Sequence, residues 1–99
     1  MKIEIGKRAS RQADRANNWW QDNRPSASLL FEQELEAALR VLLVMPNAGV
    51  AYPTTKRPNL RRLLLPRTEY HLYFALERNE TVLVIHSVWG ARRGWGPKL

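Results

Sequence analysis

The hydrophobic and polar positions of this chain follow one period at its start and another soon after. Residues 2–5, "KIEI", alternate, with Ile3 and Ile5 on one side, and this pattern predicts a short strand. From residue 9 the apolar positions recur at helical spacing, which predicts a helix. Its inward positions would be Ala9, Ala13, Ala16 and Trp20. Trp19 adjoins Trp20, and two neighbours on a helix cannot both face inward, so one tryptophan should be partly exposed.

A second helix is the clearest element of the pattern. Its apolar stripe consists of Phe31, Leu35, Ala38, Leu39 and Leu42. The stretch "QDNRPS" separates the two helices, and we expect Asn23 to satisfy backbone donors there and Pro25 to open the second helix. The stretch "MPNAG", from Met45 to Gly49, ends that helix. Because few residues join the two helices, they should form an antiparallel hairpin.

Three strands are predicted in the second half of the chain, at about residues 61–65, 70–77 and 81–89. A surface connection punctuated by Pro53 and Pro58 precedes them. The stretch "ERNET" between the last two strands is typical of a tight turn. We therefore expect these two strands to form a β-hairpin.

The length of that turn decides which side chains share a face of the hairpin. With residues 79–80 as the loop, Tyr73 lies opposite His86. On the same register His71 lies opposite Val88, and a loop of odd length would reverse the faces. The face expected under the helices holds Tyr70, Leu72, Phe74, Leu76, Leu83, Ile85 and Trp89. The opposite face holds His71, Tyr73, Glu77 and His86 among valines, a mixture suited to a cleft or a partner.

The element order is therefore β-α-α-β-β-β, and the fold class is α+β: an N-terminal strand and an antiparallel helical hairpin packed on a small, mostly antiparallel sheet. A chain of 99 residues suffices for one modest core, so we expect a single domain over residues 1–99. No apolar run approaches the roughly 18–20 residues that cross a bilayer, and no signal peptide is visible. The absence of cysteine excludes disulfides, a thiolate nucleophile and a Cys-based zinc site. We predict a cytoplasmic protein without membrane contact.

The charge is distributed unevenly. The net charge is +7, of which residues 1–49 carry +1 (seven basic, six acidic) and residues 50–99 carry +6 (nine basic, three acidic). The basic residues of the second half form two clusters along the chain: Lys56, Arg57, Arg61, Arg62 and Arg67, and then Arg92, Arg93 and Lys98. Such a field attracts phosphates or an acidic protein segment, although a solvated basic surface that serves solubility has the same composition.

Several stretches resemble the RelE/ParE toxin superfamily: "VMPNAG", the following "YP", and "LRRLLLPRTEYHLYF…VLVIHSVWGARRGWGPKL". The likeness runs nearly end to end and is closest to the ParE-like branch. It implies the RelE/ParE-like fold and a type II toxin of the kind linked to plasmid stabilization. A small cognate antitoxin, ParD-like or similar, would neutralise it in a hetero-oligomer. RelE-like members cleave mRNA on the ribosome, whereas ParE-like members are associated with poisoning DNA gyrase.

Cleavage of RNA needs a base, an acid and cations that offset charge on the phosphate. By comparison with RelE-like toxins, Arg62 and Arg92 match two of the expected cations. Leu64, however, stands where those toxins have the other basic residue of the same strand. His71 follows Tyr70 where an arginine is usual, and the tail "RGWGPKL" provides neither tyrosine nor histidine as an acid. We therefore expect a non-nucleolytic gyrase inhibitor rather than an enzyme, with no catalytic residue, metal or cofactor.

Two histidines keep an alternative open. If His71 and His86 share a face, one neutral and one charged imidazole could cleave RNA together with Arg62 and Arg92. A histidine in a strand is more often a half-buried structural residue or a partner contact. The alternatives are therefore a ribosome-dependent mRNA endoribonuclease that uses His71 and His86, and an inactive member that only binds its antitoxin.

The residues expected to bind the target or partner are Arg62, His71, Trp89, Arg92 and Arg93. Arginine and tryptophan are enriched at interface hot spots, and here the arginines would hold carboxylates or phosphates. Trp95, which lies between glycines, either packs on a partner or folds back over the open end of the core. The antitoxin segment should dock between the helical hairpin and the sheet or extend an exposed flank. Direct nucleic-acid contact stays open beside these partners.

Overall fold

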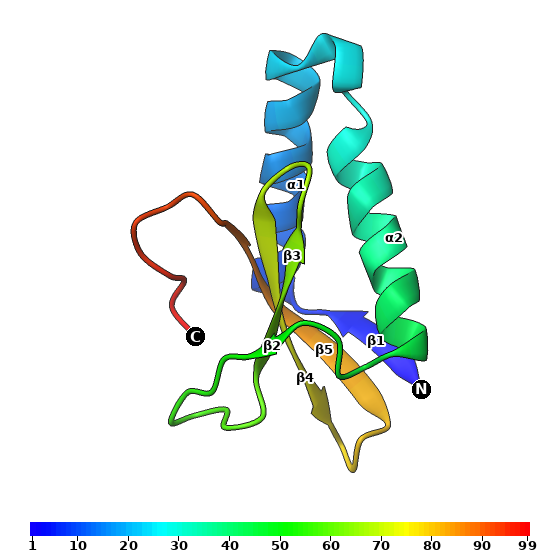
Figure 1. Cartoon of the computed structure of the whole chain (residues 1–99), viewed down its shortest axis with the longest axis vertical. Coiled ribbons are helices and arrows are strands. Elements are labelled where there is room, and N and C mark those ends of the chain that lie inside the picture. The colour runs from blue at the N-terminus through cyan, green and yellow to red at the C-terminus, as the bar shows by residue number, and fades with distance from the viewer.

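In the computed structural model, which describes residues 1–99, two helices lie side by side against one face of a five-stranded sheet (Figure 1). The helices are α1 (Lys7–Asn23) and α2 (Leu30–Val44), with a short 3-10 helix η1 (Pro25–Ala27) between them. The strands are β1 (Lys2–Ile5), β2 (Val50–Ala51), β3 (Arg61–Leu65), β4 (Tyr70–Glu77) and β5 (Val82–Gly90). Their order across the sheet is β1-β5-β4-β3-β2, and only β1 and β5 run parallel. The predicted fold class and element order are confirmed, while the two-residue β2 was not predicted.

Helix α1 packs closely on β5. The N–H of Gly6 donates to the carbonyl of Ile85 at 3.0 Å, which fixes the start of the helix at the sheet. Ala9 is fully buried, and such a small side chain lets the helix approach the strand. Near the end of the helix Trp20 packs against the core while Trp19 is 45% exposed, so the prediction of one exposed tryptophan is confirmed.

The link between the helices differs from the prediction in two details. Asn23 does not accept from backbone donors; its Nδ2 donates to the carbonyl of Trp19 at 2.9 Å. Pro25 opens η1 rather than the second helix, which begins at Leu30.

The core lies between the helices and the sheet. The predicted stripe of α2 is confirmed, because Phe31, Ala38 and Leu42 are buried and Leu35 and Leu39 pack beside them. The sheet contributes Leu65, Leu72, Phe74, Leu83, Ile85 and Val88. Burial of each large apolar side chain contributes about 1.5–3 kcal/mol, so this contact holds the helical hairpin on the sheet. Neither helix is long and apolar enough to pass through a membrane.

The β4–β5 hairpin starts in the predicted register and then departs from it. Glu77 pairs with Val82 and Phe74 with Ile85, as a loop at 79–80 requires. His86 is then an extra residue in β5, a β-bulge, so Tyr73 lies opposite Ser87 instead of His86.

The bulge also changes the pairing further along the hairpin. His71 lies opposite Trp89 instead of Val88, so both predicted pairs are wrong. One inserted residue exchanges the faces of everything that follows, because side chains alternate along a strand. Val88 therefore enters the core, and Trp89, which was expected there, packs in a separate cluster.

Candidate functional site

The face of the sheet turned away from the helices, here called the outer face, has a small cluster of its own. Leu60, Tyr73 and Ala75 are buried there, and Tyr52, Trp89 and Leu99 pack against them. Two irregular segments supply the cover: the β2–β3 loop and the tail, residues 91–99, which swings out from β5 and turns back (Figure 1). The outer face is therefore partly enclosed.

A hollow of about 210 Å³ lies between this face and the tail. It is called the aromatic hollow, and its side chains are Tyr52, Arg62, His71, Tyr73, Trp89, Arg93 and Trp95. Four of the five residues expected to bind a partner meet here: Arg62, His71, Trp89 and Arg93. They come from β3, β4, β5 and the tail, so only the folded sheet brings them together.

Each arginine of the aromatic hollow lies against a ring. The guanidinium carbon of Arg62 is 5.0 Å from the ring centroid of Tyr52, and that of Arg93 is 4.2 Å from the centroid of Trp89. Cation–π contacts of this kind hold the guanidinium plane while leaving its N–H groups free to donate. Both cations are thus oriented before any ligand arrives.

The tail is anchored through Trp89. Its Nε1 donates to the backbone carbonyl of Trp95 at 2.8 Å. The indole of Trp95 itself is 68% exposed, so the alternative in which it folds back over the core is wrong. An exposed tryptophan held on an anchored backbone suits contact with another molecule.

His71 is the titratable group of this hollow. Burial, and then the Arg62 guanidinium, lower the pKa of its imidazole from the usual 6.5, so the ring is neutral at pH 7. The ring of Tyr73 lies edge-on at 6.0 Å. Across the strand pair stands Leu64, 45% exposed, at the position where a nuclease of this superfamily would place a cation.

The second histidine lies elsewhere. His86 Nε2 contacts the carboxylate of Glu77 and lines a different hollow, beside Lys56 and Arg57. The bulge at His86 has shifted the register on which the proposed imidazole pair depended. The two rings therefore do not face a common space.

Arg92 lies outside the aromatic hollow. Its Nε lies 2.7 Å from a Glu69 carboxylate oxygen, near the turn between β3 and β4. It borders a hollow of about 530 Å³ that also includes Trp19, Trp20, Arg24 and Arg67. Arg93 reaches Trp89 and Arg92 reaches Glu69, and both arginines border this larger hollow.

Tyr52 belongs to the site, although it was not among the residues predicted to bind. The short β2 pairs with β3, and the chain continues so that the N–H of Tyr52 donates to the carbonyl of Leu60 at 2.9 Å. This brings its ring under Arg62. The "AYP" stretch offered a signal only in that an aromatic residue stood in a connection expected at the surface.

This fold, with a helical hairpin on one face of a mixed sheet and a tail bordering the other, is similar to a solved toxin–antitoxin structure. A chain of the "Chromosomal ParDE TA system from P. aeruginosa" aligns with a TM-score of 0.74 over 93% of this chain and 97% of that chain, at 18% identity. No curated protein matches the sequence significantly. Residues 3–95 match the family described as "ParE toxin of type II toxin-antitoxin system, parDE", and the chain belongs to this family. The resemblance to the ParE-like branch is thereby confirmed.

Proposed function

We propose that this chain is a toxin that acts by binding, inhibits DNA gyrase and is neutralised by a cognate antitoxin. Its family supports the toxin role. The observation that favours binding over cleavage is the make-up of the aromatic hollow. Leu64 rather than a cation faces His71 across the strand pair, and His86 lies in another hollow.

The aromatic hollow has the chemistry of a protein-binding hot spot. Arg62 and Arg93 are stacked on rings, so little side-chain entropy is lost when their N–H groups engage a carboxylate. Trp95 offers an exposed aromatic surface beside them. An acidic surface of the target enzyme would meet both features at once.

Two features support an amphipathic antitoxin segment as partner. A groove of about 220 Å³ between α1 and the end of β5 is bordered by Gln12, Ala16 and Val88. The end of α2 exposes a group of large apolar side chains, Val41, Leu43, Val44 and Met45, of which Val44 is 81% exposed. Apolar residues gathered at one helix end are typical of a surface that a partner covers. The structural relative comes from a ParDE system.

The test of the target is gyrase supercoiling with the purified chain. We expect inhibition, and we expect Arg62→Ala with Arg93→Ala to weaken it at least tenfold, since two hot-spot cations are lost together. The matched control is Arg11→Ala with Arg40→Ala, which removes the same charge from exposed helix positions. Arg92→Ala alone should weaken inhibition less, because Arg92 lies outside the hollow. Unchanged inhibition by the Arg62 and Arg93 variant, with an unchanged circular dichroism spectrum, would contradict the proposed site.

One observation favours the endoribonuclease as second candidate: neutral His71 lies in one hollow with Arg62 and Arg93, so a base and two cations are present. Primer extension on translated mRNA from induced cells separates the two functions. Discrete cuts at the ribosomal A site that disappear in His71→Ala would favour the nuclease. Growth unaffected by induction would favour an inactive, antitoxin-binding member.

A further inference from the structure

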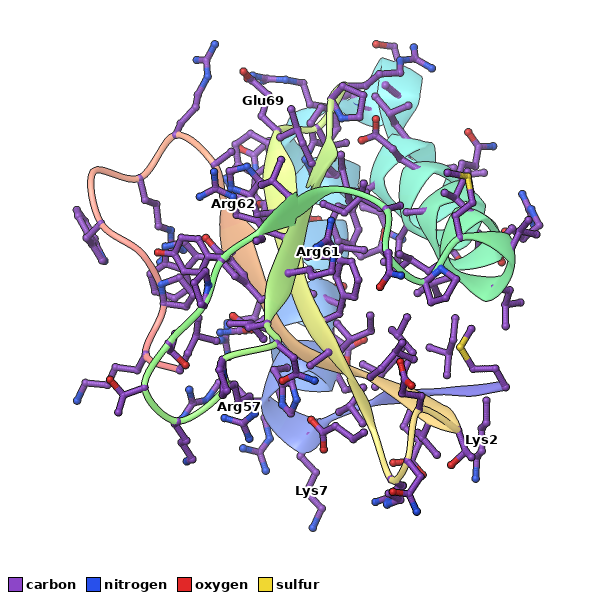
Figure 2. All side chains as sticks on the ribbon, turned by 60° about the horizontal axis from the view of Figure 1, so that its bottom comes forward. Lys2, Lys7, Arg57, Arg61, Arg62 and Glu69 are labelled. Atoms are coloured by element: carbon purple, nitrogen blue, oxygen red, sulfur yellow. The ribbon has the colours of Figure 1, made fainter.

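A second hollow, of about 340 Å³, gathers positive charge from three distant segments. Lys7 and Arg8 come from the start of α1, Lys56 and Arg57 from the β2–β3 loop, and Lys98 from the tail. Figure 2 shows Lys7 and Arg57 near one another at one end of the molecule, far from Glu69 at the other. This is called the basic hollow.

Little negative charge offsets these cations. Glu77 is the one acidic side chain that pairs with the group, at 3.9 Å from Arg57 Nε, and it also contacts His86. The ammonium groups of Lys7, Lys56 and Lys98 make no ion pair and no hydrogen bond. Glu77 is therefore the one acidic side chain that pairs with any of the five cations.

The hollow is also held in shape. Arg57 Nη1 donates to the backbone carbonyl of Leu99 at 3.2 Å, and Arg8 Nη1 donates to that of Lys98. The loop is closed by reciprocal bonds, with Thr54 N–H donating to the Arg57 carbonyl at 3.0 Å and Arg57 N–H to Thr54 Oγ1 at 2.9 Å. The two arginines are thus used to tie loop, helix and tail together, while the lysines remain available.

The gathered charge is unfavourable without an anion. Like charges repel, and the first turn of α1 carries Lys7 and Arg8 with no acidic residue, so the positive end of the helix dipole adds to the same field. The lining includes one apolar residue, Leu99, and its one ring is the imidazole of His86. Such a surface suits the oxygens of a multiply charged anion and offers nothing to a base or an apolar side chain.

We propose that the basic hollow binds phosphate groups, carried by a nucleic-acid backbone or by a free nucleoside triphosphate. Lysine ammonium groups act as point charges that donate to phosphate oxygens from any direction. Several phosphates in one ligand would meet Lys7, Lys56 and Lys98 together, whereas a carboxylate brings a single charge. The basic hollow is separate from the aromatic hollow, and phosphate binding there does not depend on the proposed inhibition of gyrase.

The test is fluorescence anisotropy of the purified chain with a labelled 20-base-pair DNA duplex, over roughly 50–200 mM salt. We expect Lys56→Ala with Lys98→Ala to weaken binding at least tenfold. The slope of log K against log salt should fall by about 2, because two phosphate contacts are lost. Lys2→Ala with Arg40→Ala removes the same net charge from outside the hollow, and it should weaken binding less than threefold. Lys7→Ala removes one charge of the hollow independently of the other two lysines. Alanine is a better helix former than lysine, so the start of α1 should stay folded in this variant.

The arms of the experiment separate the two sources of phosphate. Duplex binding that millimolar ATP does not displace supports the nucleic-acid backbone. Calorimetric binding of ATP that is lost in the Lys56 and Lys98 variant supports the free nucleotide. Equal losses in the site and control variants, or no binding of either ligand, would overturn the proposal. So would an acidic peptide that binds as tightly as the duplex and is weakened by the same substitutions. These binding assays contain no gyrase, so a negative result in them is distinguishable from a negative result in the gyrase supercoiling test.

Discussion

The aromatic hollow and the basic hollow are both bordered by the tail, yet they hold their cations in different ways. In the aromatic hollow Arg62 and Arg93 lie against rings that pack on buried Tyr73. In the basic hollow Lys56 and Lys98 make no cation–π contact and no ion pair. The arginines of the aromatic hollow therefore contribute to the packing of the fold. The lysines of the basic hollow do not, and other contacts stabilise the fold around them.

This difference separates stability from binding. A substitution in the aromatic hollow removes packing as well as a contact surface, so folding and function should change together. Substitution of a lysine in the basic hollow removes charge alone, so binding should change while stability stays constant or rises. Three measurements test that distinction, beginning with the largest expected effect.

The largest effect should come from Tyr73→Ala. Tyr73 is 2% exposed and centres the cluster of the outer face, so its truncation should lower the free energy of unfolding by about 3–5 kcal/mol. Lys56→Ala with Lys98→Ala should change it by no more than about 0.5 kcal/mol. Urea denaturation of both variants measures the contrast. Similar losses in the two would show that the basic hollow also supports the fold.

A smaller effect is expected from His71 as the pH falls. Burial, followed by the Arg62 charge, lowers the pKa of His71 below 6.5, so the unfolded chain takes up this proton before the folded chain does. The stability that the neutral ring provides is present above pH 6.5 and is lost as the pH falls below it. Urea denaturation at pH 7.5 and pH 5.5 should show a smaller loss in His71→Gln than in the unaltered chain. An equal loss in both would mean that His71 is not perturbed by its hollow.

The smallest effect should come from Lys7→Ala, and it should be a gain. A lysine in the first turn opposes the dipole of α1, so its removal should raise the free energy of unfolding by about 0.3–1 kcal/mol at low salt. The gain should shrink in 1 M salt, where charges are screened within about 3 Å. Thermal denaturation at both salt concentrations measures it, with Lys2→Ala as a control beside Glu4. A loss of stability would show that Lys7 has a favourable partner.

Local patterns predicted much of this molecule. The stripe of α2 and the strands at Arg61–Leu65 and Tyr70–Glu77 follow from side-chain periodicity, which depends on residues a few positions apart. The proximity of Arg62 and His71 was also within reach, since they sit on strands that pair in sequence order, whereas Trp89 was expected on the opposite face. The contribution of Tyr52 could not be predicted, because no sequence pattern near it indicates the two-residue β2.

The sequence by itself determined the α+β class, the order of the main elements, the exposed tryptophan of α1 and the excess of positive charge in the second half. Tertiary structure alone decided the faces of the last strand. β1 ends at Ile5, so no strand lies beside Val88 on the β1 side of β5. The Val88 N–H donates instead to Gln12 Oε1 of α1 at 2.8 Å, 76 residues away in the sequence. That contact accompanies the bulge at His86, which places Trp89 on the outer face and parts the two histidines. A one-residue change of register reverses every later side chain, and only long-range contacts select between the two registers.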